Sequence, residues 1–169
     1  KKIINRSRNV TKRLSKGIEY LMKKNNIQII KGRGKLIENN IIEIEKPDKS
    51  IQNIQSQHCI IATGARAKSM SNIIPDGNQI ITYKEAMILD NQPKTMIIIG
   101  AGAIGVEFAH FFNTFGTEVI LIEALPYILP NEDIEISEAL KKILIKRKIK
   151  ILTDSTVKEI KSLKSKVKI

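Results

Sequence analysis

The sequence predicts an α/β fold, in which helices pack on a parallel sheet and a small antiparallel β-meander precedes it. Residues 96–99 and 119–122 are short aliphatic runs, as is typical of parallel strands that are buried on both faces. The segment between them has the apolar spacing of a helix, so the order is strand, helix, strand. Shorter apolar runs before residue 63 are separated by turn residues and predict the meander.

Residues 3–25 are predicted to form an amphipathic helix, because apolar side chains recur mostly three or four positions apart with Lys and Arg between them. Such a stripe is more often buried against a sheet than laid on a membrane, so we expect burial. No apolar stretch reaches the roughly 18 residues that span a bilayer, and no membrane partner is expected. The apolar positions are Ile3, Val10, Leu14, Ile18, Leu21 and Met22.

The meander follows this helix and contains a turn at residues 47–50. Cys59, the only cysteine, lies in an apolar run and is expected to be a small buried side chain. One cysteine excludes a disulfide within the chain and fits a reducing, cytoplasmic location. The predicted strands are 27–30, 41–45, 51–54 and 58–63.

A polar loop over residues 66–77 and a short helix over 83–89 lead to residues 90–93, where turn-forming residues and a proline suggest a linker. We therefore predict two segments. The first covers residues 1–92 and the second, with the aliphatic strands, covers 93–169.

In the second segment, the helix after the first strand is predicted over 103–115 and is ended by Gly116. Another helix is predicted over 132–147, with acids at its start and Lys and Arg at its end, and a strand follows at 149–153. Residues 157–169 keep strand-like spacing to the end of the chain, so we expect an internal piece of a longer protein. The first helix is expected to bury Ile104, Phe108, Phe111 and Phe115 on one face.

Three glycines stand between the first aliphatic strand and its helix. Gly100 would make the tight turn, Gly102 would let backbone approach a pyrophosphate, and Gly105 would let the helix pack closely on the strand. The helix start offers unpaired N–H groups to the pyrophosphate. The second strand ends in an acid, Glu123, eighteen positions after Gly105. This order indicates a dinucleotide site, and the alternative is a turn that serves packing alone.

Glu123 favours NAD over NADP. A carboxylate can accept hydrogen bonds from both ribose hydroxyls, but it repels the additional phosphate of NADP. Two like charges about 4 Å apart repel by roughly 4 kcal/mol at a dielectric near 20, and a third of that is about a tenfold preference. No Arg or Lys lies between Glu123 and Pro130 to offset the repulsion.

The chain has a formal net charge of +12, which raises the question of a nucleic-acid surface. Lys and Arg are spread from end to end, and no aromatic residues interleave them as a stacking platform requires. Abundant Ile, Lys and Asn share AT-rich codons, so we attribute the charge to genomic bias and expect no nucleic-acid partner.

These residues resemble the flavoprotein disulfide reductases, and most closely the members that oxidise dihydrolipoamide. The resemblance covers nearly the whole chain and rests on residues 32–35, 62–66, 100–107, 123–130 and 153–157. It implies a Rossmann-like architecture that binds FAD and NAD.

The resemblance also implies site residues. Glu123 would bind the adenosine ribose of NAD, Val157 would contact its adenine end, and Ile104 would lie beside the nicotinamide. Glu107 stands in what we take as the first turn of the helix, where the dipole alone could explain an acid, but the resemblance gives it a flavin-side lysine outside this chain as partner. The pyrophosphate would lie at Gly100, Ala101, Gly102, Ala103, Ile104 and Gly105. The FAD contacts would be Gly34, Thr63, Gly64 and Ala65.

The implied activity passes two electrons from protein-bound dihydrolipoamide through a disulfide and FAD to NAD⁺. The implied partners are a second copy, as a homodimer, and the lipoyl domains of 2-oxoacid dehydrogenase complexes. The redox cysteines and the histidine base would lie outside this chain, and His58 and His110 are expected to be structural or exposed. The alternatives are another disulfide reductase or NADH oxidase of the same architecture, and a non-catalytic NAD-binding module.

Overall fold

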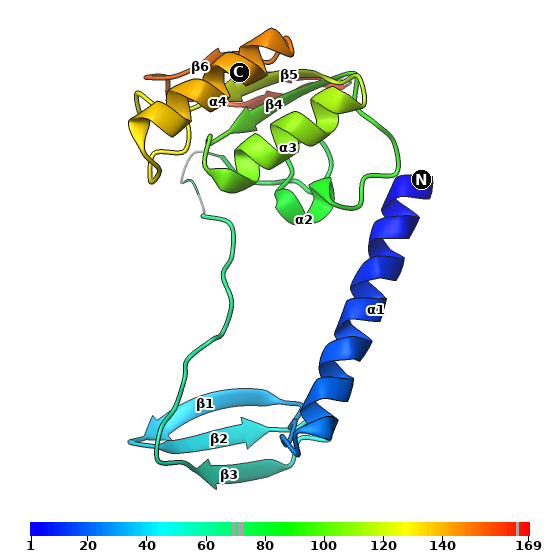
Figure 1. The fold of residues 1–169 in the computed structure, drawn as a ribbon, viewed down its shortest axis with the longest axis vertical. Coiled ribbons are helices and arrows are strands. Elements are labelled where there is room, and N and C mark those ends of the chain that lie inside the picture. The colour runs from blue at the N-terminus through cyan, green and yellow to red at the C-terminus, as the bar shows by residue number, and fades with distance from the viewer. Residues whose placement is uncertain (69, 71–72, 165) are drawn as a thin grey trace. The chain divides into compact units, whose positions relative to one another are not determined.

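The computed structural model describes residues 1–68, 70, 73–164 and 166–169. It contains two compact units: residues 2–66, and residues 67–169 together with Lys1 (Figure 1). Residues 67–92 therefore belong to the same compact unit as the glycine-rich segment, while the assignment of domains to 1–92 and 93–169 stays a prediction. The polar loop predicted over 66–77 includes residues 69, 71 and 72, which lie outside the described residues.

The first unit begins with helix α1, Lys2–Lys24, as predicted. Lys23 and Lys24 in its last turn complement the negative end of the helix dipole. The expected burial of its apolar stripe is wrong for this chain, because no residue of α1 is buried. An amphipathic pattern shows that one face favours an apolar neighbour, but it does not say which element supplies that neighbour.

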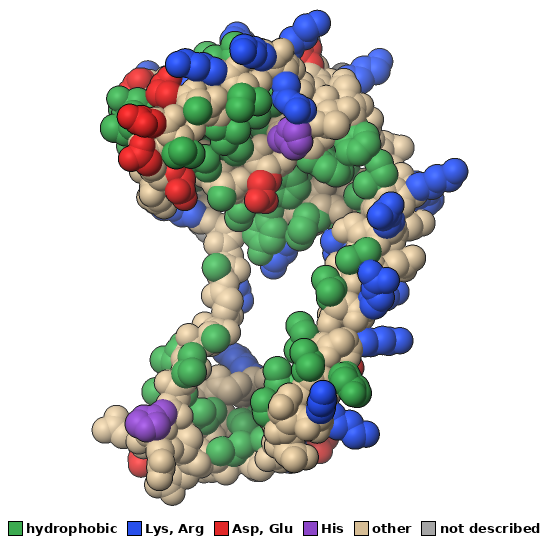
Figure 2. Space-filling view, viewed as in Figure 1, with side chains coloured by type: hydrophobic (Ala, Val, Ile, Leu, Met, Phe, Trp, Pro, Cys, Tyr) green, Lys and Arg blue, Asp and Glu red, His purple; other side chains and the backbone are tan. Residues whose placement is uncertain are grey.

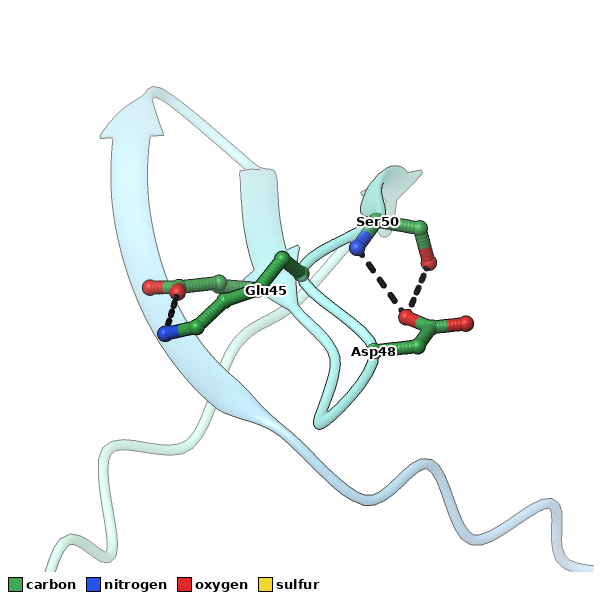
Figure 3. Close-up of polar contacts among 4 residues, drawn as sticks. Glu45, Asp48 and Ser50 are labelled. Carbon is green, nitrogen blue, oxygen red and sulfur yellow. Dashed lines mark hydrogen bonds and ion pairs between the residues drawn. The ribbon is translucent and has the colours of Figure 1, made fainter.

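A three-stranded antiparallel sheet completes this unit, in the order β1 (Arg33–Glu38), β2 (Ile41–Glu45), β3 (Ile51–Gln55). Strands β2 and β3 and the turn between them confirm the prediction. In that turn, the Asp48 carboxylate accepts hydrogen bonds from the backbone N–H of Ser50 at 3.0 Å and from its hydroxyl at 2.7 Å (Figure 3). Lys49 has φ +69° and pairs with Glu45 at 2.8 Å.

Three further predictions in this unit are wrong. Residues 27–30 and 58–63 were predicted as strands but form none. In addition, strand β1 was not predicted, because its sequence mixes charged residues, glycine and only two large apolar side chains. Its pairing with β2 makes it a strand: Gly34 lies opposite Ile44 and Lys35 opposite Glu43. Cys59 is exposed rather than buried, because the run around it does not join the sheet.

The second unit is built on a parallel sheet in the order β4 (Thr95–Ile99), β5 (Glu118–Ile122), β6 (Lys150–Leu152), which confirms the predicted fold class. Helix α3, Ala103–Thr114, connects β4 to β5, and helix α4, Ile134–Lys146, connects β5 to β6 (Figure 1). The short helix α2, Tyr83–Ala86, is shorter than predicted. It starts with a capping box, in which Thr82 caps the helix and Glu85 reaches back to the Thr82 backbone.

The core of this unit lies between the sheet and the helices, where Val119 and Leu121 of β5 are fully buried. The buried face of α3 differs from the predicted one: Ile104 and Phe115 are 58% and 44% exposed, and Phe108 and Phe111 are only partly buried. This helix is apolar nearly all round, so spacing alone leaves its rotation open. The residues of α3 that are buried are Val106, Ala109 and Phe112.

The end of the described chain forms a hairpin of β7 (Lys161–Ser162) and β8 (Val167–Lys168). Strand-like spacing over 157–169 predicted extended structure here, and residue 165 of that segment lies outside the described residues. Within the described part of the chain, no helix combines the length and the apolar character that crossing a bilayer requires.

Candidate functional site

The glycine turn, residues 100–102, lies at the carboxyl end of β4, the edge of a parallel sheet where ligands bind in open α/β folds. Gly100 has φ +98°, a conformation that side chains disfavour. Its N–H donates to the carbonyl of Ile122 at 2.8 Å, so the turn begins directly at the end of the β4–β5 ladder. The predicted role of Gly100 as the tight-turn residue agrees with this geometry.

Gly102 is the N-cap of α3 and has no side chain to cap the helix. A Cβ built on Gly102 would meet no atom within 4 Å, so the space in front of the helix start is open. The first N–H groups of a helix have no partner within the helix and carry the positive end of its dipole. Open space and unpaired donors together suit an anionic group such as a pyrophosphate.

Gly105 lies against the glycine turn. A Cβ on Gly105 would lie 1.9 Å from the carbonyl oxygen of Gly100 and 3.5 Å from the side chain of Ile98. Any side chain here would force α3 away from β4. The structure thus gives Gly105 the close helix–strand contact that the sequence predicted.

Glu123 follows β5 directly and lies beside the glycine turn. Glu123 as a whole is only 8% exposed. One carboxylate oxygen, Oε2, accepts a hydrogen bond from the backbone N–H of Ala101 at 2.7 Å, and the other, Oε1, accepts one from Leu125 at 3.0 Å. These two bonds were missed by sequence reasoning, although an acid that follows a buried strand and faces a glycine turn is a signal for backbone contacts.

Ala101 is held from its other side as well. Its carbonyl accepts a hydrogen bond from the N–H of Leu129 at 2.8 Å, and Leu129 has φ +49°. Ala101 is fully buried. Both backbone polar groups of this residue are therefore bound by the Glu123 loop, residues 123–130.

Val157, the predicted contact of the adenine end, is buried and packs in a small cluster with Ile73 and Ile122, the residue before Glu123. An open hollow of about 410 Å³ adjoins it and is lined by residues 156–159 and by Lys161, Lys168 and Ile169. The structure therefore brings the glycine turn, Glu123 and Val157 into one unit.

Ile104 and Glu107 lie on α3 and are both exposed. The sequence predicted Glu107 in the first turn of α3, and this is wrong. The helix starts at Ala103 and its first turn contains no acid. Dipole effects fall off beyond the first turn, so helix-dipole complementation explains Glu107 less well than the sequence suggested.

The predicted FAD contacts lie in the first unit. Gly34 is in β1, opposite Ile44, and Gly64 has φ +79° in an irregular, exposed segment that includes Thr63 and Ala65. His58 and His110 are both exposed, as expected. In the described part of the chain, no three His, Cys, Asp or Glu side chains lie close enough together to hold a metal ion.

The chain matches the family model described as pyridine nucleotide-disulphide oxidoreductase over residues 1–169. It is 42% identical to the dihydrolipoyl dehydrogenase of Zymomonas mobilis over 94% of the chain, and 41% identical to that of Rhizobium etli over 95%. The matches cover 34% and 36% of these proteins, so the chain spans about a third of their length.

Solved structures have the same fold. LpdA from Mycobacterium tuberculosis aligns with 98% of the chain and 38% of its own at a TM-score of 0.87 and 24% identity. The HOCl-induced flavoprotein disulfide reductase RclA of Escherichia coli aligns with 97% of the chain and 37% of its own at a TM-score of 0.78 and 28% identity. With the family match over all 169 residues, the resemblance in the sequence is confirmed: the chain belongs to the pyridine nucleotide-disulphide oxidoreductase family.

Proposed function

We propose that this chain is the NAD-binding segment and part of the FAD-binding segment of an NAD-dependent dihydrolipoyl dehydrogenase. The observation that carries the proposal is the glycine turn with the Glu123 carboxylate beside it, at the carboxyl edge of a parallel sheet. Identities of 35–42% to dihydrolipoyl dehydrogenases support this activity, and the matched family uses FAD and NAD.

The residues present fit NAD. Open space at Gly102 and the donors of α3 suit the pyrophosphate. A carboxylate oxygen offers two acceptor positions, and each oxygen of Glu123 uses one for a backbone amide. One position on each oxygen therefore stays available for a ribose hydroxyl. When bound, NAD⁺ would supply a hydride acceptor, and this chain would bind and orient it.

We propose that Gly34 contacts the adenine end of FAD and that residues 63–65 form a turn that approaches FAD, as the sequence resemblance implies. Gly64, in a conformation that favours glycine, permits a sharp backbone turn there. FAD would carry electrons between the disulfide and NAD.

In the proposed overall reaction, a dithiol is oxidised to a disulfide and loses two electrons and two protons. Two electrons and one proton leave as a hydride equivalent to NAD⁺, and the second proton goes to solvent. The single cysteine here cannot form the reacting disulfide within this chain. We propose that the intact protein is a cytoplasmic homodimer that accepts lipoyl domains of 2-oxoacid dehydrogenase complexes.

Another disulfide reductase is the competing proposal, supported by the structural likeness to RclA. The identity to RclA, 28%, is lower than that to the dihydrolipoyl dehydrogenases, so the latter activity is preferred. Turnover of dihydrolipoamide by the intact protein, compared with other disulfide substrates, distinguishes the two.

Titration of the intact protein with NADH and NADPH, followed by fluorescence, tests the proposal. We expect NADH to bind about tenfold more tightly, because Glu123 repels the additional phosphate of NADPH. Glu107→Gln serves as an internal comparison. Its exposed side chain lies beyond the first turn of α3, so NADH affinity should be unchanged. Hydride transfer to the flavin should slow, because the substitution removes the charge that the resemblance pairs with a flavin-side lysine. Equal affinities for the two dinucleotides in the unmodified protein would contradict the assignment.

A further inference from the structure

The geometry points to a second role for Glu123: we propose that it is a positioning residue, which holds the glycine turn in shape before any dinucleotide binds. This inference rests on the proposed function, since the glycine turn is the proposed pyrophosphate site. It differs from ribose recognition, because it concerns contacts that Glu123 makes to the protein itself.

The Glu123 carboxylate binds two different backbone segments. Its Oε2 atom accepts the N–H of Ala101, in the glycine turn, at 2.7 Å, and its Oε1 atom accepts the N–H of Leu125 at 3.0 Å. Hydrogen bonds to an ionised acceptor are shorter and stronger than those between neutral groups. The bond to Ala101 is buried, where no water can replace it.

The position of Glu123 is itself fixed by the sheet. Its N–H donates to the carbonyl of Leu152 at 2.8 Å, and its carbonyl accepts the N–H of Ser155 at 2.9 Å. These bonds tie it to β6 and the segment after β6. The carboxylate therefore reaches the glycine turn from an anchored backbone.

The backbone of the glycine turn depends on contacts with other segments to keep its conformation. Gly100 has no side chain, so its backbone conformation is restricted less than that of other residues. Ala101, which follows it, has its N–H bound by Glu123 and its carbonyl bound by Leu129. The peptide planes on either side of Ala101 are thus fixed, and with them the direction in which Gly102 and the first N–H groups of α3 point.

The Glu123 carboxylate can accept hydrogen bonds from both backbone N–H groups because both of its oxygens are acceptors. Glutamine at position 123 would place an NH₂ group against one of the two backbone N–H groups, so two donors would face each other. Aspartate keeps the charge but is shorter by one methylene group and would not reach both amides at these distances. The two substitutions therefore disturb the positioning contacts in different ways.

The test is hydrogen exchange on the intact protein without dinucleotide. We expect Glu123→Gln and Glu123→Asp each to speed exchange of the Ala101 and Leu125 amides by about tenfold, while the Val119 amide in β5 stays unchanged. Glu118→Gln is the matched control, since it makes the same chemical change on the exposed first residue of β5. It should leave all three amides as they are.

Binding supplies the second readout. In Glu123→Asp, the negative charge remains, and we expect NADH and NADPH both to bind about tenfold more weakly because the pyrophosphate site itself is disturbed. Ribose recognition alone would predict weaker binding of NADH and unchanged binding of NADPH. That result, with unchanged exchange at Ala101 and Leu125, would overturn the inference.

Failure of the proposed function would look different. If the unmodified protein bound neither dinucleotide, the NAD assignment would fail, but exchange at Ala101 would still report whether Glu123 holds the turn. If a Glu123 variant did not fold, as judged by exchange throughout β4, the other variant would be compared with Glu118→Gln. Unchanged exchange in a folded Glu123 variant overturns the inference.

Discussion

Gly102 and Gly105 of the proposed site differ in the space that each offers to a side chain. A Cβ at Gly105 would lie 1.9 Å from the Gly100 carbonyl, which is backbone and cannot rotate away, whereas a Cβ at Gly102 would meet nothing within 4 Å. We expect Gly105→Ala to destabilise the protein by about 1–3 kcal/mol through overpacking. Gly102→Ala should lower stability by less than about 1 kcal/mol, because alanine is a poorer N-cap than glycine. It should weaken NADH binding, because its methyl group would occupy the proposed pyrophosphate space.

Thermal unfolding and an NADH titration of each variant measure this contrast. The two variants serve as controls for each other, since the chemical change is identical. Loss of stability in Gly102→Ala equal to that in Gly105→Ala would contradict the different surroundings of the two glycines.

At the residue scale, the sequence predicted the tight turn at Gly100 and the close packing at Gly105, because each follows from a local requirement of backbone geometry. The ribose-binding role of Glu123 stays a prediction. The sequence did not predict the contacts between the Glu123 carboxylate and the backbone. The contact with Ala101 joins residues 22 positions apart, and its geometry depends on how the Glu123 loop returns to the turn.

Helix α4 begins at a defined cap, which can be tested. The Asp133 side chain accepts a hydrogen bond from the N–H of Glu135 at 2.8 Å. Asp133→Ala should lower the free energy of unfolding by about 1 kcal/mol, because an unpaired N–H and the loss of a charge at the dipole both disfavour the helix start. Urea unfolding measures it, with Glu132→Ala as the control at the adjacent exposed residue. Equal losses in both variants would exclude a capping role.

The loop at Asp76 should respond to acid. Its Oδ1 atom accepts hydrogen bonds from the N–H groups of Asn78, Gln79 and Ile80 at 2.8–2.9 Å. The bond from Ile80, followed by that from Asn78, holds the pKa of Asp76 below its usual 3.8. A depressed pKa in the folded state means that this stabilisation is present above about pH 4 and is lost as the pH falls through the folded-state value.

Asp76→Ala should therefore lower the urea midpoint near pH 7, and the difference from the unmodified protein should shrink near pH 3. Asp90→Ala, at an exposed aspartate outside this loop, is the control. A difference that grows on acidification would contradict a lowered pKa of Asp76 in the folded state.

Among the elements, strands were predicted where the apolar pattern was strong, as in β4 and β5, and missed where pairing decided the structure. Strand β1 has weak local signals and is a strand because β2 lies beside it. Residues 27–30 and 58–63 show the converse, since their apolar composition is favourable but neither run forms a strand. Strand formation depends on a partner, which local composition does not reveal.

At the scale of the whole molecule, the charge of +12 comes from 29 Lys and Arg against 17 Asp and Glu. Basic side chains lie along α1 and also on the unit that contains the parallel sheet (Figure 2). We expect only weak binding to duplex DNA, which should fade as salt rises from about 50 to about 200 mM, because non-specific contacts depend on counterion release. Fluorescence anisotropy with a labelled duplex measures it. Sequence-selective binding that survives physiological salt would show a dedicated nucleic-acid surface.

The exposure of Cys59 has a practical consequence for studying these 169 residues. It is the only thiol in the chain and is accessible, so a maleimide dye or nitroxide would couple at one known position. That position lies in the unit of residues 2–66, away in sequence from the glycine turn and Glu123. A probe there would report on the unit of residues 2–66 without modifying the glycine turn or Glu123, and it would lie four residues before Thr63, a proposed FAD contact.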